Sequence, residues 1–156
     1  MRKGQKVGVA ILAAGTVMAM GVPALAKAHP LVHKAVIKVG GKKTVVLEAA
    51  NGRTLYYYTK NTATHSACTG ACLGLWPPYK VKSAPAHING LPGKFTVFKG
   101  QLEYEGHQLY MYSGDKGPGQ SHGEGLFHAW WVAAPKIGSP KAAKGGGGGT
   151  GGGGGW

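Results

Sequence analysis

Two stretches of this chain carry the same tyrosine-rich pattern, and this duplication restricts its possible folds more than any other feature. Residues 52–61 read GRTLYYYTKN, and residues 106–115 read GHQLYMYSGD. At a constant offset of 54 (106 − 52), Leu-Tyr-x-Tyr in one stretch falls on Leu-Tyr-x-Tyr in the other. A turn signal, Asn-Gly or Glu-Gly, opens each copy, and an apolar run precedes each turn. Both copies are therefore predicted to be β-hairpins.

The alternation within the first copy predicts which side chains share a face. Tyr56 and Tyr58 point to one side of the strand, and Leu55 and Tyr57 point to the other. Large groups on both faces indicate a strand that is covered on both sides. A two-residue turn in this hairpin would place Leu47 opposite Tyr56. The predicted fold class is all-β, a small antiparallel sandwich or barrel built from two pseudo-repeated hairpins with long loops.

The start of the chain has the order of an export signal. Basic residues are followed by an uncharged run of 16 residues from Val7 to Val22 (22 − 7 + 1) and then by Ala-Leu-Ala. An uncleaved membrane anchor is the alternative, but the run is shorter than the ~20 residues of a spanning helix. We therefore expect an extracytoplasmic protein, secreted or in the cell envelope or periplasm, with no stable membrane span after cleavage.

Changes in composition predict how the whole chain is divided. The predicted segments are a signal peptide at 1–26, a flexible mature N-terminus at 27–35, a β-rich domain at 36–137 and a disordered glycine-rich tail at 138–156. Trp156 in the tail is interpreted either as a recognition tag or as a free aromatic on a tether.

The chain is strongly basic, with 18 Lys and Arg against 5 Asp and Glu. Loss of residues 1–26 would remove three positive charges and leave a net charge of +10 (18 − 3 − 5). Such a charge favours acidic envelope polymers or other anionic surfaces as partners, although solubility alone is a competing explanation. Nucleic acid is disfavoured, because the aromatics that could stack on bases lie in strand patterns, where packing uses them first.

The cysteines number two, Cys68 and Cys72. Their C-x-x-x-C spacing differs from the C-x-x-C of redox catalysts and zinc ribbons. In an exported protein such a pair normally forms a structural disulfide, which for so short a loop contributes roughly 2 kcal/mol. A labile thiol pair or a soft-metal site is the alternative.

Histidines and one methionine suggest a metal site in the second half. His107, His122 and His128 could converge there, and with Met111 they would suit copper or a haem iron. Ordinary surface or loop histidines are the other interpretation, because no spacing places two of them on one helical face. The preferred prediction is that no cofactor is bound, with a haem- or copper-binding accessory protein as the alternative.

Asp115 is the sole aspartate and follows the second copy directly. It is predicted to cap a turn by accepting backbone N–H bonds, as Asn61 can in the first copy. A catalytic carboxylate would need a second one nearby, and Glu124 is the candidate. A hydrolase that uses Asp115 and Glu124 is therefore a further alternative, but the chain is predicted not to be an enzyme.

The pattern L-Y-x-Y-x-x-D at 109–115, with its variant at 55–61, resembles the secreted repeats with a Y-x4-D motif, found in predicted bacterial lipoproteins and exported proteins of uncharacterised function. Cys-Thr-Gly-Ala-Cys followed by Trp-Pro-Pro, and a glycine-rich loop that runs into a tryptophan, extend the resemblance to about residues 52–132. The motif residues are Tyr56, Tyr58, Asn61, Trp76, Tyr110, Tyr112, Asp115 and Trp130.

This resemblance implies an extracytoplasmic β-rich domain of two repeats and no particular activity. The chain departs from the pattern by having Asn61 in place of aspartate, no lipobox cysteine and an added glycine tail. The predicted function is an exported, non-catalytic cell-envelope or secreted module with a binding or structural role.

Overall fold

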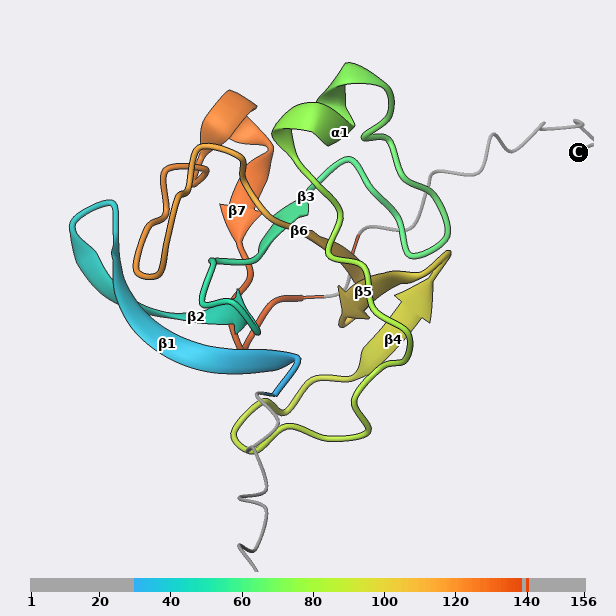
Figure 1. Cartoon of the computed structure of the whole chain (residues 1–156), viewed down its shortest axis with the longest axis horizontal. Helices are drawn as coiled ribbons and strands as arrows, with labels where there is room; N and C mark the ends of the chain where they lie inside the picture. The colour runs from blue at the N-terminus through green and yellow to red at the C-terminus, as the bar shows by residue number, and fades with distance from the viewer. Residues whose placement is uncertain (1–29, 139, 141–156) are drawn as a thin grey trace, which may run out of the picture.

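The computed structural model describes residues 30–138 and 140 (Figure 1). Its elements, in chain order, are β1 (Val32–Val39), β2 (Lys42–Ala49), β3 (Tyr56–Tyr58), α1 (Ala71–Leu75), β4 (Phe95–Phe98), β5 (Gln101–Tyr104), β6 (His107–Tyr110), the 3₁₀ turn η1 (Leu126–His128) and β7 (Trp130–Val132). The predicted signal peptide, residues 27–29 and nearly all of the predicted tail lie outside the described residues. None of the helices within the described ranges is both long and apolar enough to cross a membrane.

The strands form two antiparallel sheets. β1 pairs with β2, and the other strands form one sheet in the order β4-β5-β6-β3-β7. The long β1–β2 hairpin curves along one side of the molecule, with β4 and β5 at the opposite side (Figure 1). The arrangement is sandwich-like and not a closed barrel, and the predicted all-β class is confirmed.

Three hairpins close through two-residue turns in which both residues have positive φ. These turns are Gly40-Gly41 with φ of 53° and 83°, Lys99-Gly100 with 49° and 77°, and Glu105-Gly106 with 51° and 78°. Two positive φ values define the type I′ turn, whose twist matches that of the flanking strands. The second predicted hairpin is therefore present, as β5 and β6.

The hairpin of the first copy has a different type of turn, and the strand register predicted for it is wrong by one residue. The Leu55 N–H donates to the Leu47 carbonyl at 2.9 Å, so Leu55 and not Tyr56 lies opposite Leu47. The turn contains three residues, because the Ala49 N–H bonds to the Arg53 carbonyl at 2.9 Å. The last of the three is a glycine with φ of 79°, as expected for a three-residue hairpin loop.

The predicted start of the β-rich domain also needs correction. β1 begins at Val32, which is fully buried, so residues 32–35 belong to a strand and not to a flexible terminus. The last strand, β7, is three residues long and is preceded directly by η1. Phe127 and His128 have φ of 54° and 50°, which a strand does not accommodate.

The core consists of two clusters of buried side chains. The alternation predicted for β3 is confirmed, because Leu55 and Tyr57 pack in one cluster while Tyr56 and Tyr58 pack in the other. The β1–β2 hairpin contributes to both clusters. Residues of the first cluster include Val32, Leu47, Leu91, Leu102, Tyr104 and Leu109, and those of the second include Ile37, Val46, Cys68, Trp76, Tyr110 and Trp130.

Candidate functional site

The two tyrosine-rich copies lie side by side in the larger sheet. Tyr56 on β3 is directly opposite Tyr110 on β6, and Tyr57 is opposite Leu109. Tyr56 and Tyr110 occupy the same position of the two copies. Antiparallel pairing at this position therefore relates the copies by an approximate two-fold axis that passes between the two tyrosines.

The two-fold relation extends beyond the tyrosines. The Tyr79 N–H donates to the Leu109 carbonyl at 2.9 Å, and the Ala133 N–H donates to the Leu55 carbonyl at 2.7 Å. The offset of 54 links the two donors (133 − 79) and the two acceptors (109 − 55). The duplication therefore includes the strand segments that follow each long loop.

Tyr56 bonds to the aspartate of the other copy. Its hydroxyl donates to Asp115 Oδ2 at 2.6 Å and accepts the Gly123 N–H at 3.3 Å. Asp115 Oδ1 accepts the backbone N–H of His122 at 3.0 Å and lies 3.0 Å from Nδ1 of the same residue. A Cβ at position 123 would lie 2.8 Å from the Trp76 ring, so only glycine allows the loop to approach this closely.

The surroundings of Tyr56 keep its phenol protonated. Burial raises its pKa well above the ordinary value of 10.0, and the hydrogen bond to Asp115 and the carboxylate's negative charge raise it further. A phenol in this state donates a hydrogen bond and does not act as a base or nucleophile near neutral pH.

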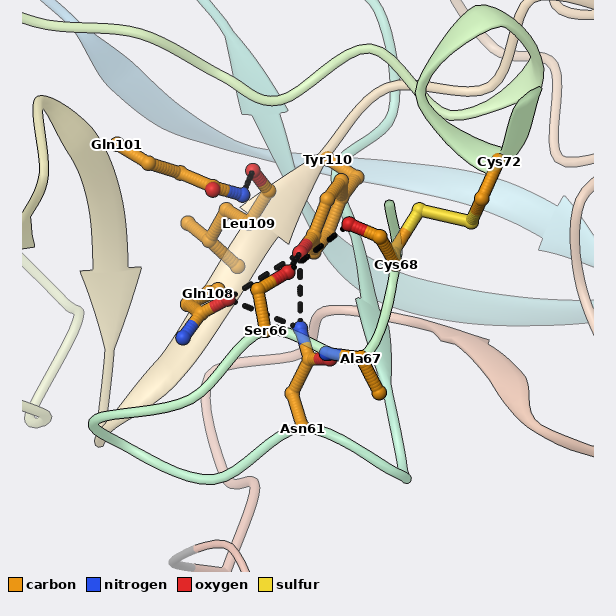
Figure 2. The surroundings of a disulfide bond; sticks show 9 residues. All are labelled: Asn61, Ser66, Ala67, Cys68, Cys72, Gln101, Gln108, Leu109 and Tyr110. Atoms are coloured by element: carbon orange, nitrogen blue, oxygen red, sulfur yellow. Dashed lines mark hydrogen bonds between the residues drawn. A yellow bond between two sulfur atoms is a disulfide. The ribbon is translucent and has the colours of Figure 1, made fainter. Parts of the chain in front are cut away.

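Tyr110 makes the equivalent contact with the first copy (Figure 2). Asn61 Nδ2 donates to the Tyr110 hydroxyl at 2.8 Å and to Gln108 Oε1 at 3.0 Å. Asn61 Oδ1 accepts the Ala67 N–H at 2.8 Å. Ser66 Oγ lies 2.9 Å from the Tyr110 hydroxyl and completes the network.

Each tyrosine is thus bonded to the polar residue of the opposite copy, and we call these contacts, Tyr56–Asp115 and Tyr110–Asn61, the exchanged pairs. All four side chains are at most 3% exposed. Asp115 and Asn61 accept N–H groups seven and six positions ahead (122 − 115 and 67 − 61), so they close long loops and do not cap a local turn. The exchanged pairs tie the two copies together and present no reactive group at the surface.

The tryptophans and the second tyrosine of each copy form an aromatic stack, defined as Tyr58, Trp130, Trp76 and Tyr112. The Trp76 and Trp130 rings are parallel within 1°, with centroids 3.8 Å apart. Tyr58 packs on Trp130 at 4.4 Å, and Tyr112 packs on Trp76 at 4.7 Å. Tyr58 and Tyr112 are related by the offset of 54, as are Trp76 and Trp130, so the contact of Tyr58 with Trp130 is equivalent to that of Tyr112 with Trp76. The stack therefore follows the same two-fold relation as the exchanged pairs.

The predicted disulfide between Cys68 and Cys72 is present (Figure 2). Both cysteines of the chain are therefore oxidised, in place of the labile thiols or metal site considered as the alternative. Cys68 is buried in the same cluster as the stack, and the Cys72 carbonyl accepts the Trp76 N–H at 2.8 Å. The disulfide thus holds the short helical turn α1 from which Trp76 enters the core.

The histidines and Met111 do not gather as a metal site requires. His107 is buried on β6, with Nε2 2.5 Å from the Gly138 carbonyl, and its burial lowers its pKa. His122 contacts Asp115, His128 is exposed on η1, and Met111 packs against the first core cluster. Across the described part of the chain, no three His, Cys, Asp or Glu side chains are placed to hold a metal ion. The alternative interpretation, in which these three histidines converge on a metal ion, is therefore contradicted for the described residues.

Asp115 and Glu124 have separate partners. Asp115 is fully engaged in its exchanged pair and in the loop, whereas Glu124 Oε2 accepts the Val132 N–H at 2.7 Å. Each carboxylate therefore satisfies backbone or buried groups of its own surroundings, and the two do not form a hydrogen-bonded acid–base pair.

Carboxylates are withdrawn from the surface throughout the domain. Of the five acidic residues in the chain, Glu48, Glu103 and Asp115 are at most 5% exposed. The other two, Glu105 and Glu124, are half-buried and accept backbone N–H bonds from Lys94 and Val132. Within the described residues, every lysine is exposed and none is paired with a carboxylate: Lys34, Lys38, Lys42, Lys43, Lys60, Lys80, Lys82, Lys94, Lys99, Lys116 and Lys136.

Glu103 leads to a pH-dependent prediction. Its Oε2 accepts the Thr96 hydroxyl at 2.7 Å, but its Oε1 is buried without a partner, and burial raises its pKa although the Thr96 bond opposes the shift. Because the pKa of Glu103 is higher in the folded state than in the unfolded state, its protonated form favours folding. This contribution to stability is complete below the unfolded pKa of about 4.5 and is lost as the pH rises through the folded-state pKa. Glu103→Gln should remove this loss and raise the free energy of unfolding at pH 7 by about 1 kcal/mol.

Urea unfolding between pH 4 and 8 checks this expectation, with Glu105→Gln on the half-buried turn as the matched control. Parallel pH profiles for the wild type and Glu103→Gln would contradict it.

An apolar groove beside the stack was not anticipated from the sequence. It has a volume of about 350 Å³ and no charged lining residue. Its lining residues are Tyr58, Ala71, Cys72, Leu75, Trp76, Phe127 and Trp130. The available signal was an apolar residue shortly before each tryptophan, Leu75 and Phe127, but only the packing of one tryptophan on the other brings these residues together.

Comparison with known proteins finds a family model that matches part of the chain. Residues 39–80 match the family described as a secreted repeat of unknown function. The matched segment runs from the end of β1 to Lys80 and contains Tyr56, Asn61, the disulfide and Trp76. The second copy lies outside the secreted-repeat match and is related to the first by its structure. Searches of curated proteins and of solved structures gave no match. The secreted-repeat match and the disulfide agree on a location outside the cytoplasm.

Proposed function

We propose that this protein is an exported, non-catalytic module that binds acidic envelope polymers or other anionic surfaces. The supporting observation is the segregation of charge, with exposed lysines and withdrawn carboxylates. Because the lysines have no acidic neighbours to neutralise them, their fields add over the surface and attract polyanions. The secreted-repeat match supports the extracytoplasmic setting of this role.

A lysine tip, defined as Lys38, Lys42 and Lys43, is the strongest candidate contact. It surrounds the Gly40-Gly41 turn of the β1–β2 hairpin, which lies at an edge of the molecule away from β4 and β5 (Figure 1). Lys38 is directly opposite Lys43, an arrangement of like charges that destabilises a strand pair. A bound anionic group would relieve this repulsion, so the hairpin gains stability when it binds.

The non-catalytic part of the proposal draws support from the use of the motif residues. Tyrosine, asparagine and aspartate side chains that could carry chemistry are buried in the exchanged pairs and bonded to one another. The conspicuous residues of the repeat therefore hold its shape, and the lysine-rich outer surface is left for binding.

Replacing the lysine tip tests this function. The triple variant Lys38→Gln, Lys42→Gln and Lys43→Gln should lower the affinity for polyphosphate or dextran sulfate on the order of tenfold at low salt. The dependence of log affinity on log salt concentration should become shallower, because fewer counterions are released. Its thermal stability should be unchanged or higher, since like charges are removed.

The control is the triple variant Lys80→Gln, Lys82→Gln and Lys136→Gln, which removes the same charge from exposed positions elsewhere. Equal losses in both variants would assign binding to diffuse charge and not to the tip. Absence of polyanion binding by the wild type, or binding that ignores salt, would refute the proposed function.

A further inference from the structure

The apolar groove beside the aromatic stack is not used by the proposed polyanion binding. We propose that the indole of Trp156, from the same chain, occupies this groove. Three features support this assignment: the chemistry of the groove, the composition of the chain after Pro140 and the reach of that segment.

The groove is built to receive an uncharged ring. Its lining contains Trp76 and Trp130, which are at most 2% exposed, together with residues of α1 and of η1. Figure 1 shows α1 and the η1–β7 segment at the same end of the molecule. The lining carries no charged side chain, so an ionic ligand would lose its hydration there without gaining a partner.

The lining of the groove includes apolar side chains that are exposed to solvent. Phe127 is 73% exposed and has φ of 54°, a backbone region that is costly for a residue other than glycine. Leu75, another lining residue, is 37% exposed. An indole in the groove would cover part of both side chains and would add a ring to the existing aromatic packing.

The chain itself supplies a suitable ring. The 16 residues after Pro140 (156 − 140) comprise lysine, alanine, glycine and threonine, with Trp156 as the single aromatic. A segment of that length extends to about 55 Å. A folded domain of about this size has a radius of gyration of about 13 Å, so the indole reaches any point on its surface.

The tether also compensates for a weak contact. A linker of this length holds the group that it carries at an effective concentration in the millimolar range. An indole with a dissociation constant of about 1 mM would therefore fill the groove roughly half of the time.

NMR of the full chain labelled with ¹⁵N tests this assignment through the indole N–H signals. The chain contains four tryptophans, and the signal absent from Trp156→Ala is that of Trp156. We expect this signal to be displaced from that of a free Gly-Gly-Gly-Trp peptide, because the rings of the groove shift it. Phe127→Ala and Leu75→Ala should each move it back toward the peptide value.

Val36→Ala is the matched control, since Val36 is 66% exposed on β1 and does not line the groove. A wild-type Trp156 signal at the free-peptide position would overturn the proposal, as would a signal that neither groove variant moves. A displacement that disappears on tenfold dilution would also overturn it, because the indole would then belong to a neighbouring copy.

Discussion

Trp76→Ala should lower the free energy of unfolding by about 4 kcal/mol, the loss typical of a large aromatic removed from a core. Trp76 is 1% exposed and contacts Tyr56, Tyr112 and Trp130. Removing its ring therefore interrupts the aromatic stack in the middle and opens a cavity between the two copies. The buried Trp76 Nε1 has no hydrogen-bond partner, so the substitution breaks no side-chain hydrogen bond and its cost comes from lost packing. For a domain with about 5–15 kcal/mol of total stability, the effect is severe.

Urea unfolding followed by circular dichroism measures this effect. Trp131→Ala is the matched control, because Trp131 is the neighbour of Trp130 on β7 but is only half-buried, opposite Tyr57. Its replacement should cost about 1 kcal/mol. Equal losses in the two variants would show that the stack is not the centre of the core.

Asp115→Ala should cost about 3 kcal/mol, because it leaves buried donors without an acceptor. The Tyr56 hydroxyl and the His122 N–H both lose their partner, and the loop that follows Asp115 loses its closure. His122→Ala is the control, since it removes an exposed ring and keeps the backbone bond to Asp115. That variant should cost at most about 1 kcal/mol.

Asp115→Asn should be milder, at about 1 kcal/mol, because the pseudo-symmetric site already works with an amide. Asn61 donates to the Tyr110 hydroxyl and accepts a backbone N–H, and an asparagine at position 115 can make the same two bonds to Tyr56 and His122. Thermal melts of the two Asp115 variants compare these outcomes. An asparagine variant as unstable as the alanine variant would contradict the equivalence of the exchanged pairs. A well-folded asparagine variant that has lost a measurable activity would contradict the structural role of Asp115.

Much of the organisation of the fold could be predicted from local sequence patterns. Alternation in β3 correctly assigned Tyr56 and Tyr58 to one face, and Glu-Gly correctly marked the β5–β6 turn. The Asn-Gly turn was misread, because two- and three-residue loops share the same residues and differ only in which strand positions pair. The start of β1 was predicted too late, because Val32 is followed by the polar His33 and Lys34 and its burial depends on the pairing of β1 with β2.

For the candidate site, the sequence allowed us to predict which residues belong to it but not how they contact one another. The motif named Tyr56 and Asp115, but their contact joins positions 59 residues apart, and the contact between Asn61 and Tyr110 joins positions 49 apart. A local interpretation paired each polar residue with its own turn. The histidines were grouped because they are close in sequence, yet His107, His122 and His128 lie on a strand, in a loop and on a 3₁₀ turn.

The amino-acid sequence by itself determined what depends on neighbours along the chain: strand alternation, turn residues, the doubled motif and an excess of positive charge. Tertiary structure alone decided the exchange of partners between the copies, the stacking of the two tryptophans, the groove beside them and the withdrawal of carboxylates from the surface. The physical reason is that these features arise where the two-fold relation brings distant segments into contact. Burial and hydrogen bonding at such contacts depend on how the copies pack, which no local pattern records.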